Sequence, residues 1–262
     1  MGAAPWSDLL ASTHFSDPAT LLAGLAAVTL VGLSKGGLGG AFALMGVPVL
    51  ALVMPPVQAA ALLLPVLLAM DAASLWTWRG RAQTHLLRAL LPPAILGIGL
   101  GWLAAAVTPE AAVKLIVGLL ALGFVARQFL RPRPPVSGPR RASAWGWGSL
   151  AGFTSFVAHA GGPPFQMHVL PLRLDPRDYT GTSVVFFAVV NVVKLVPYAA
   201  LGLFEPQLLI AALWLMPVAV LAVLTGAAIV RRMRIEVFYP FIFTMLALVG
   251  AKLIWDGVTG LV

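Results

Sequence analysis

Two glycine-rich stretches, each between two apolar segments, constrain the fold of this chain more than any other feature. They cover residues 32–40 and 152–164. Glycine and proline break helices, and a break exposed to lipid would leave backbone amides and carbonyls without hydrogen-bond partners. Each break must therefore line a cavity within the protein. The amides that begin the next half-helix make such a cavity suitable for an anion.

The composition indicates a polytopic membrane protein. Hydrophobic residues make up 60% of the 262 residues and charged residues 10%, whereas about a quarter of a soluble domain is charged. The net charge of +8 would suggest nucleic acid as the partner of a soluble protein. Here the arginines lie in short connections between apolar segments, so we expect no nucleic acid partner. We attribute the positive charge instead to connections that stay on the cytoplasmic side of the membrane. Cysteine is absent, which excludes disulfides and thiolate metal sites.

The apolar segments have two lengths. Six have about the 20 residues that a spanning helix needs, and four are shorter. The spanning segments are residues 57–78, 86–107, 110–130, 178–201, 206–230 and 235–255. The shorter ones form a pair around each glycine-rich stretch: residues 20–34 with 38–53, and residues 143–158 with 163–172. Residues 1–18 lack the basic start of a signal peptide, so we expect an extramembrane lead-in there.

The chain divides into two similar halves. A connection rich in proline and arginine, residues 131–142, predicts a cytoplasmic linker between one membrane repeat over residues 19–130 and a second over residues 143–262. The halves share sparse matches that keep their order. These are Gly39-Gly40 with Gly161-Gly162, Pro92 and Gly101 with Pro217 and Gly226, and Glu110 with Glu236.

The arginines predict how the repeats are related. All fall in or beside residues 79–88, 127–141, 173–177 and 231–234, and basic connections favour the cytoplasm. With all four places on that side, each short pair must form a re-entrant hairpin, and each half has three spans. We therefore expect an all-α fold of two inverted repeats, with the hairpin tips near the midplane and both termini periplasmic. The alternative is eight full spans and a parallel repeat, in which the short segments cross a thin or distorted bilayer.

Two lysines lie at the depth of the glycine-rich stretches. Lys35 is in the first stretch and Lys194 is near the middle of a spanning segment, where an uncompensated ammonium costs at least about 2.5–3.5 kcal/mol. Each therefore needs an anionic ligand, a carboxylate or a ring of carbonyls. Asn191 lies one turn before Lys194; an amide next to a cation suits an oxyanion, although asparagine also clamps membrane helices together. Lys114 and Lys252 lie near span ends, where we expect them to reach the headgroups.

Other polar residues are candidates for contact with a permeant species. Asp71 is the only acid well inside a span; it either takes up a coupling proton or, as we favour, pairs with Lys35 or Lys194. His159 and Ser155 lie one turn apart beside the second glycine-rich stretch, as ligands or as packing residues. The remaining candidates are hydroxyls early in their span and glycines that permit close backbone approach: Thr182, Ser183, Gly36, Gly37, Gly39, Gly40, Gly161 and Gly162.

No enzyme signature competes with transport. The motifs HExxH, G-x-S-x-G and G-x-x-x-x-G-K-[ST] are all absent. We therefore expect no catalysis, no metal and no cofactor. A membrane hydrolase or lipid transferase based on His159 and Ser155 is the alternative from another class.

The same regions resemble the TauE/SafE family of sulfite exporters. The likeness rests on residues 32–40 with Gly46-Val47-Pro48, 56–60 through Pro65 to Asp71, 158–164, Gly181-Thr182-Ser183 and Asn191 to Lys194, and it extends from about Leu21 onward. It implies a protein of the bacterial inner membrane that moves sulfite, thiosulfate, sulfoacetate or related organosulfonates. The chain departs from the commoner family form at Lys35, where many members have a small residue. It departs again at residues 159–163, where three glycines are frequent.

The residues and the resemblance together predict a secondary transporter of a small sulfur-containing oxyanion. The two hairpin tips with Asn191 and Lys194 would form its site, opened alternately to each side. The alternatives are a channel and a carrier of carboxylates or other anions. Its partners are the anion and the bilayer, and the sequence leaves proton coupling and homo-oligomerisation open.

Overall fold

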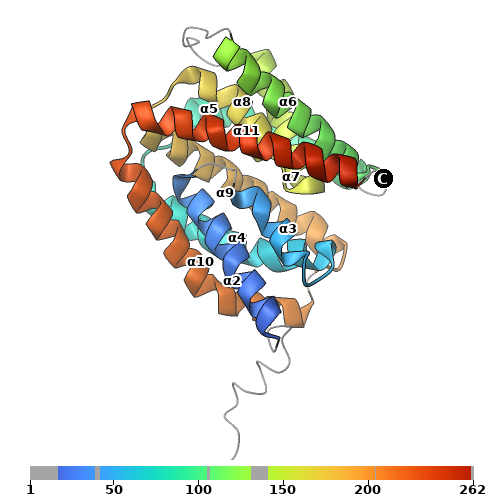
Figure 1. Ribbon diagram of the computed structural model, residues 1–262. Helices are drawn as coiled ribbons and strands as arrows, with labels where there is room; N and C mark the ends of the chain where they lie inside the picture. Colours follow the sequence, from blue (N-terminus) through green and yellow to red (C-terminus); the bar gives the residue numbers. More distant parts are fainter. Residues whose placement is uncertain (1–16, 39–41, 105–106, 131–140, 204, 261–262) are drawn as a thin grey trace, which may run out of the picture.

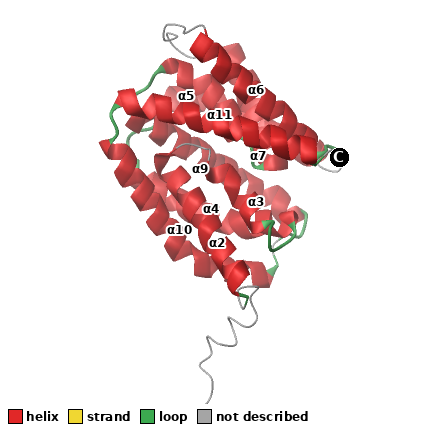
Figure 2. Ribbon diagram, in the orientation of Figure 1, coloured by secondary structure: helices red, strands yellow, loops and turns green. Residues whose placement is uncertain are grey.

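The computed structural model describes residues 17–38, 42–104, 107–130, 141–203 and 205–260, which contain helices and no strand (Figures 1 and 2). The long helices are α2 (Pro18–Leu33), α4 (Pro56–Thr77), α5 (Thr84–Ala104), α6 (Glu110–Leu130), α7 (Arg141–Ala158), α9 (Pro176–Ala200), α10 (Pro206–Arg232) and α11 (Ile235–Thr259). The short elements are a π turn (Ser34–Leu38), α3 (Gly46–Leu50), α8 (Gly162–Val169) and two 3₁₀ turns (Phe42–Met45 and Leu170–Leu172). Helix α7 begins at Arg141, and residues 131–140 of the predicted linker lie outside the described part of the chain.

Seven helical segments in the described residues are long and apolar enough to cross a membrane. Six of them coincide with the predicted spanning segments. The seventh, Pro18–Leu38, shows that the first short segment was predicted too short, because helical turns continue through the π turn to a length of 21 residues. The break itself falls at Gly37, whose φ of 127° is a conformation that side chains other than hydrogen rarely permit.

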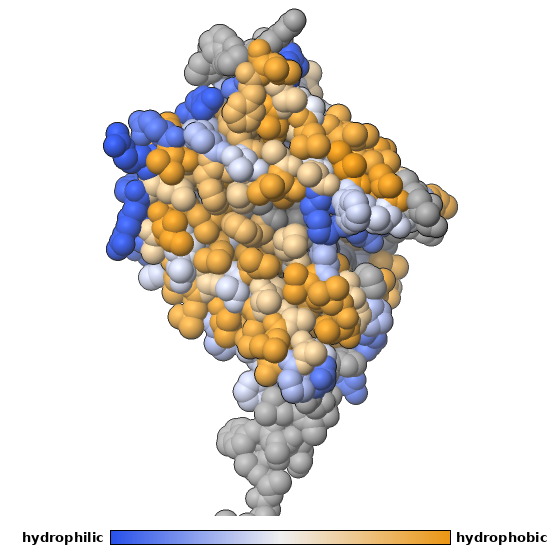
Figure 3. All heavy atoms as spheres, in the orientation of Figure 1, coloured by the Kyte–Doolittle hydropathy of each residue, from blue (hydrophilic) through white to orange (hydrophobic). Residues whose placement is uncertain are grey.

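The surface of these helices is apolar. Large hydrophobic side chains such as Leu22, Leu103, Val196 and Leu221 are exposed, and Figure 3 shows apolar atoms over most of the visible face. Hydrophilic atoms gather in Figure 3 at the edge where α10 meets α11. A soluble protein would not leave so many long apolar helices uncovered. The chain is therefore a multi-pass membrane protein.

Asp17 begins the first of these segments. Its carboxylate accepts hydrogen bonds from the hydroxyl and the amide of Thr20, at 3.0 and 3.1 Å, and so caps α2. The hydroxyl bond, followed by the amide bond, lowers the pKa of Asp17 below its usual range. A charged cap at this point fixes where the chain enters the helix.

One group of packed helices contains α2, α3, α4 and α10 (Figure 1, lower part). At the end of α2, the carbonyl of Lys35 accepts from Ser74 Oγ at 3.2 Å, and the carbonyl of Gly36 accepts from Trp78 Nε1 at 3.1 Å. Ser74 and Trp78 lie at the end of α4, so α2 and α4 run in the same direction. The chain between them, which includes α3, must fold back, and α2 with α3 forms a helical hairpin.

The second group contains α5, α6, α7, α8 and α11 (Figure 1, upper part). Helix α8 returns along α7, since His168 Nδ1 of α8 lies 3.0 Å from Ser143 Oγ at the start of α7. Helices α7 and α8 therefore form a second hairpin. Beside it, α6 and α11 pack closely through Gly118, where an added Cβ would lie 2.7 Å from the Gly250 carbonyl oxygen.

Helix α9 joins the two groups, because it packs against α4 and α10 on one side and α5 and α7 on the other. Three of the four arginine-rich places meet near its first turn. Arg81 Nη1 lies 3.9 Å from Asp178, Arg177 donates to the Arg231 carbonyl at 3.2 Å, and Arg231 donates to the Thr77 carbonyl at 2.7 Å. These places therefore lie at one end of the helix bundle. The fourth, residues 127–141, lies largely outside the described residues.

Candidate functional site

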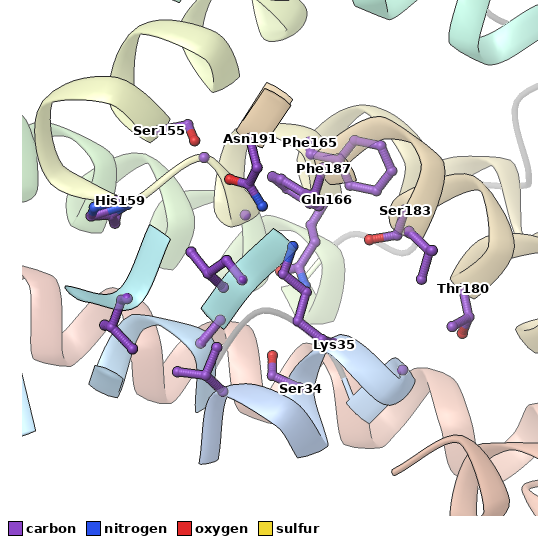
Figure 4. A pocket seen from close by; sticks show the side chains of 18 of the residues that line it. Ser34, Lys35, Ser155, His159, Phe165, Gln166, Thr180, Ser183, Phe187 and Asn191 are labelled. Carbon is purple, nitrogen blue, oxygen red and sulfur yellow. The ribbon is translucent and has the colours of Figure 1, made fainter. Parts of the chain in front are cut away.

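A central cavity of about 100 Å³ lies between the two hairpins and α9 (Figure 4). The first hairpin and α4 contribute mainly apolar groups and Lys35, whereas the second hairpin and α9 contribute most of the polar groups. In Figure 4, Lys35 and Asn191 point to the centre from opposite sides, and His159 and Thr180 lie at opposite ends of the view. A cavity of this size has room for several waters or one small ligand.

Lys35 has a carboxylate partner. Its Nζ lies 2.5 Å from Asp71 Oδ1, and Asn191 Nδ2 donates to Asp71 Oδ2 at 2.7 Å. The side chains of Lys35 and Asp71 are only 11% and 4% exposed, so the pair is held inside the protein. The contact agrees with the favoured interpretation, in which Asp71 pairs with Lys35 or Lys194. It also places Asn191 as a donor to that pair, so that α4 and α9 are joined at the cavity.

Lys194 has no carboxylate in contact within the described residues. Its side chain is fully buried, and Nζ donates to the Ser155 carbonyl at 3.1 Å. Nζ also lies 3.0 Å from His159 Nδ1, and the other ring nitrogen lies 3.1 Å from the Tyr198 hydroxyl. The Lys194 side chain is therefore held by a carbonyl at the end of α7 and by the imidazole ring of His159. Those groups solvate the ammonium but do not cancel its charge.

Most of the predicted site residues lie together around the central cavity. Nine of the predicted residues border the cavity: Lys35, Gly37, Ser155, His159, Gly161, Gly162, Ser183, Asn191 and Lys194. Asp71 lies behind Lys35. Gly36 is buried against α10 and its carbonyl is bonded to Trp78, so it does not line the cavity. Gly39 and Gly40 lie outside the described residues.

Thr182 was predicted to touch the permeant species, but it lies away from the cavity. Its hydroxyl donates to the backbone carbonyl of Asp178 at 2.7 Å and accepts from the backbone amide of Gln83 at 2.9 Å, near the arginine-rich end of the bundle. The residue two positions earlier, Thr180, lines the cavity instead. A helix turns by 100° per residue, so Thr180 shares a face with Ser183 and Asn191 whereas Thr182 does not.

Several lining residues were not predicted. Gln166 and Phe165 come from α8, and Thr180 and Phe187 from α9. For α9 a signal existed, since the lining positions are spaced by three or four residues back from Lys194. For α8 no such signal existed, because all seven of its residues from Pro163 to Val169 are buried and no face is distinguished.

A second cavity of about 300 Å³ adjoins the first. Two ion pairs border it: Lys114 Nζ lies 2.6 Å from Glu110 on α6, and Lys252 Nζ lies 2.5 Å from Asp256 on α11. The two lysines that were expected to reach the headgroups thus bind an acid one turn away and border a cavity. His159 lines both cavities.

The family comparison agrees with this architecture. The family model described as sulfite exporter TauE/SafE matches residues 24–253, which include every described residue that borders the central cavity. A search of curated proteins and a search of solved structures each found no match. A match over nearly the whole chain is sufficient to assign the family. This multi-pass membrane protein belongs to the TauE/SafE sulfite exporter family.

Proposed function

We propose that the chain is a secondary transporter that moves a small sulfur-containing oxyanion, such as sulfite, thiosulfate or an organosulfonate, through the central cavity. The observation that carries the proposal is the charge of that cavity. Lys35 and Lys194 bring two ammonium groups, and Asp71 brings one carboxylate that is already bound to Lys35. The remaining positive charge, on Lys194, favours an anion.

The polar groups around Lys194 suit an oxyanion. An ammonium has three hydrogens, and the contacts with Ser155 and His159 use two of them, so one is left for a ligand. Thr180 Oγ1 is buried and has no hydrogen-bond partner among the described residues, although the residue lines the cavity. Phe165 and Phe187 complete the wall with apolar surface. A small anion would gain donors there without competition from bulk water.

We also propose that the two halves are inverted repeats. A constant difference of 120 residues relates Gly32 to Gly152, Lys35 to Ser155, Asp71 to Asn191 and Ser74 to Lys194. The contacts agree with this relation: Ser74 donates to the Lys35 carbonyl, and Lys194 donates to the Ser155 carbonyl. A Cβ on Gly32 would meet the Ala219 carbonyl oxygen, and one on Gly152 would meet that of Ala94. Repeats of opposite orientation allow the hairpins to open the cavity alternately to the two sides.

The proposed orientation follows from the arginine-rich end. The connections that contain Arg81, Arg177 and Arg231 lie together and are assigned to the cytoplasm of a bacterial inner membrane. The starts of α2 and α4 then face the periplasm. The first hairpin enters and leaves the membrane on the periplasmic side, and the second hairpin does so on the cytoplasmic side. Both termini are periplasmic in this arrangement.

Replacing Lys194 with methionine tests the proposed site. We expect the half-saturation concentration for the anion to rise about ten- to hundredfold, because a hydrogen bond to a charged group is worth about 1.5–3 kcal/mol. Methionine keeps the length of the side chain and removes the charge. The measurement is uptake of labelled sulfite, thiosulfate and small sulfonates into proteoliposomes. Arg88→Met is the control, since Arg88 is exposed on α5 and far in sequence from every lining residue.

The kinetics of the wild type distinguish the related functions. A carrier saturates and exchanges internal for external anion, whereas a channel conducts without counter-transport. Unchanged affinity and rate in Lys194→Met, with saturable wild-type flux, would remove Lys194 from the site. Flux of small carboxylates but of no sulfur anion would move the substrate to another class.

Replacing Thr180 with valine gives opposite effects on binding and on stability. We expect anion affinity to fall about two- to tenfold, because a neutral hydrogen bond contributes about 0.5–1.5 kcal/mol. The melting temperature should stay the same or rise, since the buried hydroxyl has no protein partner to lose. Thr225→Val is the control, because Thr225 is exposed on α10 and, within the described part of the chain, its hydroxyl donates to the Leu221 carbonyl one turn earlier on the same helix. A fall in stability with unchanged affinity would make Thr180 a packing residue.

A further inference from the structure

His159 lies where the two cavities meet. It follows α7 in the connection to α8 and lines both the central cavity and the second cavity. Of the described lining residues, the others common to both cavities are the apolar Ala43 and Val47 of the first hairpin. His159 is therefore the polar residue, among the described ones, that borders both cavities.

With Lys194 charged, the hydrogen bonds of the ring determine its tautomer. An ammonium can only donate, so His159 Nδ1, 3.0 Å from Lys194 Nζ, is the acceptor and carries no hydrogen. The ring hydrogen is then on Nε2, which donates to the Tyr198 hydroxyl. A second proton would occupy Nδ1 and face the hydrogens of Lys194. The pair can thus hold one positive charge in this arrangement, not two.

The other charged groups that face His159 are already paired. They are Glu110 with Lys114 on α6, Lys252 with Asp256 on α11, and Lys35 in the first hairpin with Asp71 on α4. The uncompensated charge next to the ring, among the described residues, is that of Lys194. Both carboxylate oxygens of Asp71 are already bound, one by Lys35 and the other by Asn191.

We propose that His159 takes up one proton when the anion binds and releases it when the anion leaves, and so couples transport to the proton gradient. This inference rests on the proposed transport function and names its coupling residue. An anion beside Lys194 accepts hydrogen bonds from both the ammonium and a protonated Nδ1, which removes the conflict between the two charges. Binding of the anion and binding of the proton then favour each other reciprocally. The proton comes from water in the second cavity and returns to water.

Replacing His159 with asparagine tests the inference. The asparagine amide oxygen can occupy the place of Nδ1 and accept from Lys194, and asparagine tolerates the φ of 50° at this position. The asparagine side chain cannot take up a proton near neutral pH. In proteoliposomes we expect exchange of labelled sulfite, and in parallel thiosulfate, to continue at equal pH on both sides but with lower affinity, because the variant lacks the Nδ1 hydrogen that the bound anion accepts. A gradient of one pH unit should drive about tenfold accumulation in the wild type and none in the variant.

The control is His85→Asn, because His85 is exposed at the start of α5 and should leave accumulation unchanged. The titration of sulfite itself affects all variants equally and cancels in the comparison. Accumulation by His159→Asn equal to that of the wild type would overturn the inference and leave the transport function standing. If the wild type transports neither sulfite nor thiosulfate, both the inference and the proposed transport function are overturned.

A second measurement does not depend on the folding of a variant. Thiosulfate carries no titratable proton near neutral pH, so any proton taken up on binding goes to the protein. The heat of thiosulfate binding to the wild type is measured by calorimetry in buffers of different ionisation enthalpy, and its dependence on the buffer gives the number of protons taken up. We expect about one proton per thiosulfate bound, as the linkage between the two sites requires. Binding without proton uptake would overturn the inference.

Discussion

Replacing Gly152 with alanine is expected to lower the melting temperature of the protein by roughly 5–10 °C and to reduce the yield of monodisperse protein. Gly152 is on α7, and a Cβ at this position would overlap the carbonyl oxygen of Ala94 on α5. Membrane helices gain their contact energy from such close approach of small residues. Because the obstacle is backbone, the two helices must separate to admit the methyl group. Overpacking of this kind costs about 1–3 kcal/mol or more.

Gly146→Ala is the matched control for this substitution. Gly146 is on the same helix, but a Cβ there would meet nothing within 4 Å. Alanine is the better helix former by up to about 1 kcal/mol, so we expect this variant to be as stable as the wild type or slightly more so. Thermal unfolding in detergent, followed by tryptophan fluorescence, compares the two. Equal melting temperatures for both variants would mean that α5 and α7 do not pack as described.

Replacing Asp71 with alanine is expected to be the most damaging single change at the central cavity. It would leave the ammonium of Lys35, which is 11% exposed, without its carboxylate, and would remove the acceptor of Asn191. Loss of one partner of a buried ion pair costs about 3–5 kcal/mol. We therefore expect little folded protein, measured as the monodisperse fraction after extraction and as the melting temperature.

The double variant Lys35→Met/Asp71→Ala separates stability from function. It removes both charges, so we expect the melting temperature to recover largely, because an apolar pair avoids the cost of an unpaired buried charge. Transport should stay impaired, since one of the two ammonium groups of the cavity is lost. Equal destabilisation in the single and double variants would show that Asp71 acts through something other than its bond to Lys35.

The positions of the long helices were predictable, because length and hydropathy suffice to identify a spanning segment. The segments predicted from residues 57–78 and 110–130 match α4 and α6 to within a residue. The predicted end of the first short segment, residue 34, is within a residue of the end of α2 at Leu33. The π turn that follows was not predicted, since glycines in sequence break a helix only where tertiary contacts permit, and here Ser34 to Gly36 remain helical. The prediction of a break was correct at Gly37 alone among the described residues of that stretch.

The partners of the buried charges were only partly predictable. The sequence indicated that Lys35 and Lys194 need a ligand but left open which lysine binds Asp71. That choice depends on how the π turn after α2 and helix α9 are both placed against α4, and helices in lipid have few pattern differences that identify their neighbours. The contact of Lys194 with Ser155 and His159 was equally hidden, because it requires the path of the second hairpin.

The carbonyls at the ends of the outgoing hairpin limbs are held in the same way by unlike side chains. Ser74 donates to the Lys35 carbonyl at 3.2 Å, and Lys194 donates to the Ser155 carbonyl at 3.1 Å. A hydroxyl and an ammonium thus perform the same structural task, and only the ammonium adds a charge. Of the two donors, only Lys194 borders the central cavity. The charge of that cavity therefore depends on which kind of side chain holds the carbonyl of the second hairpin.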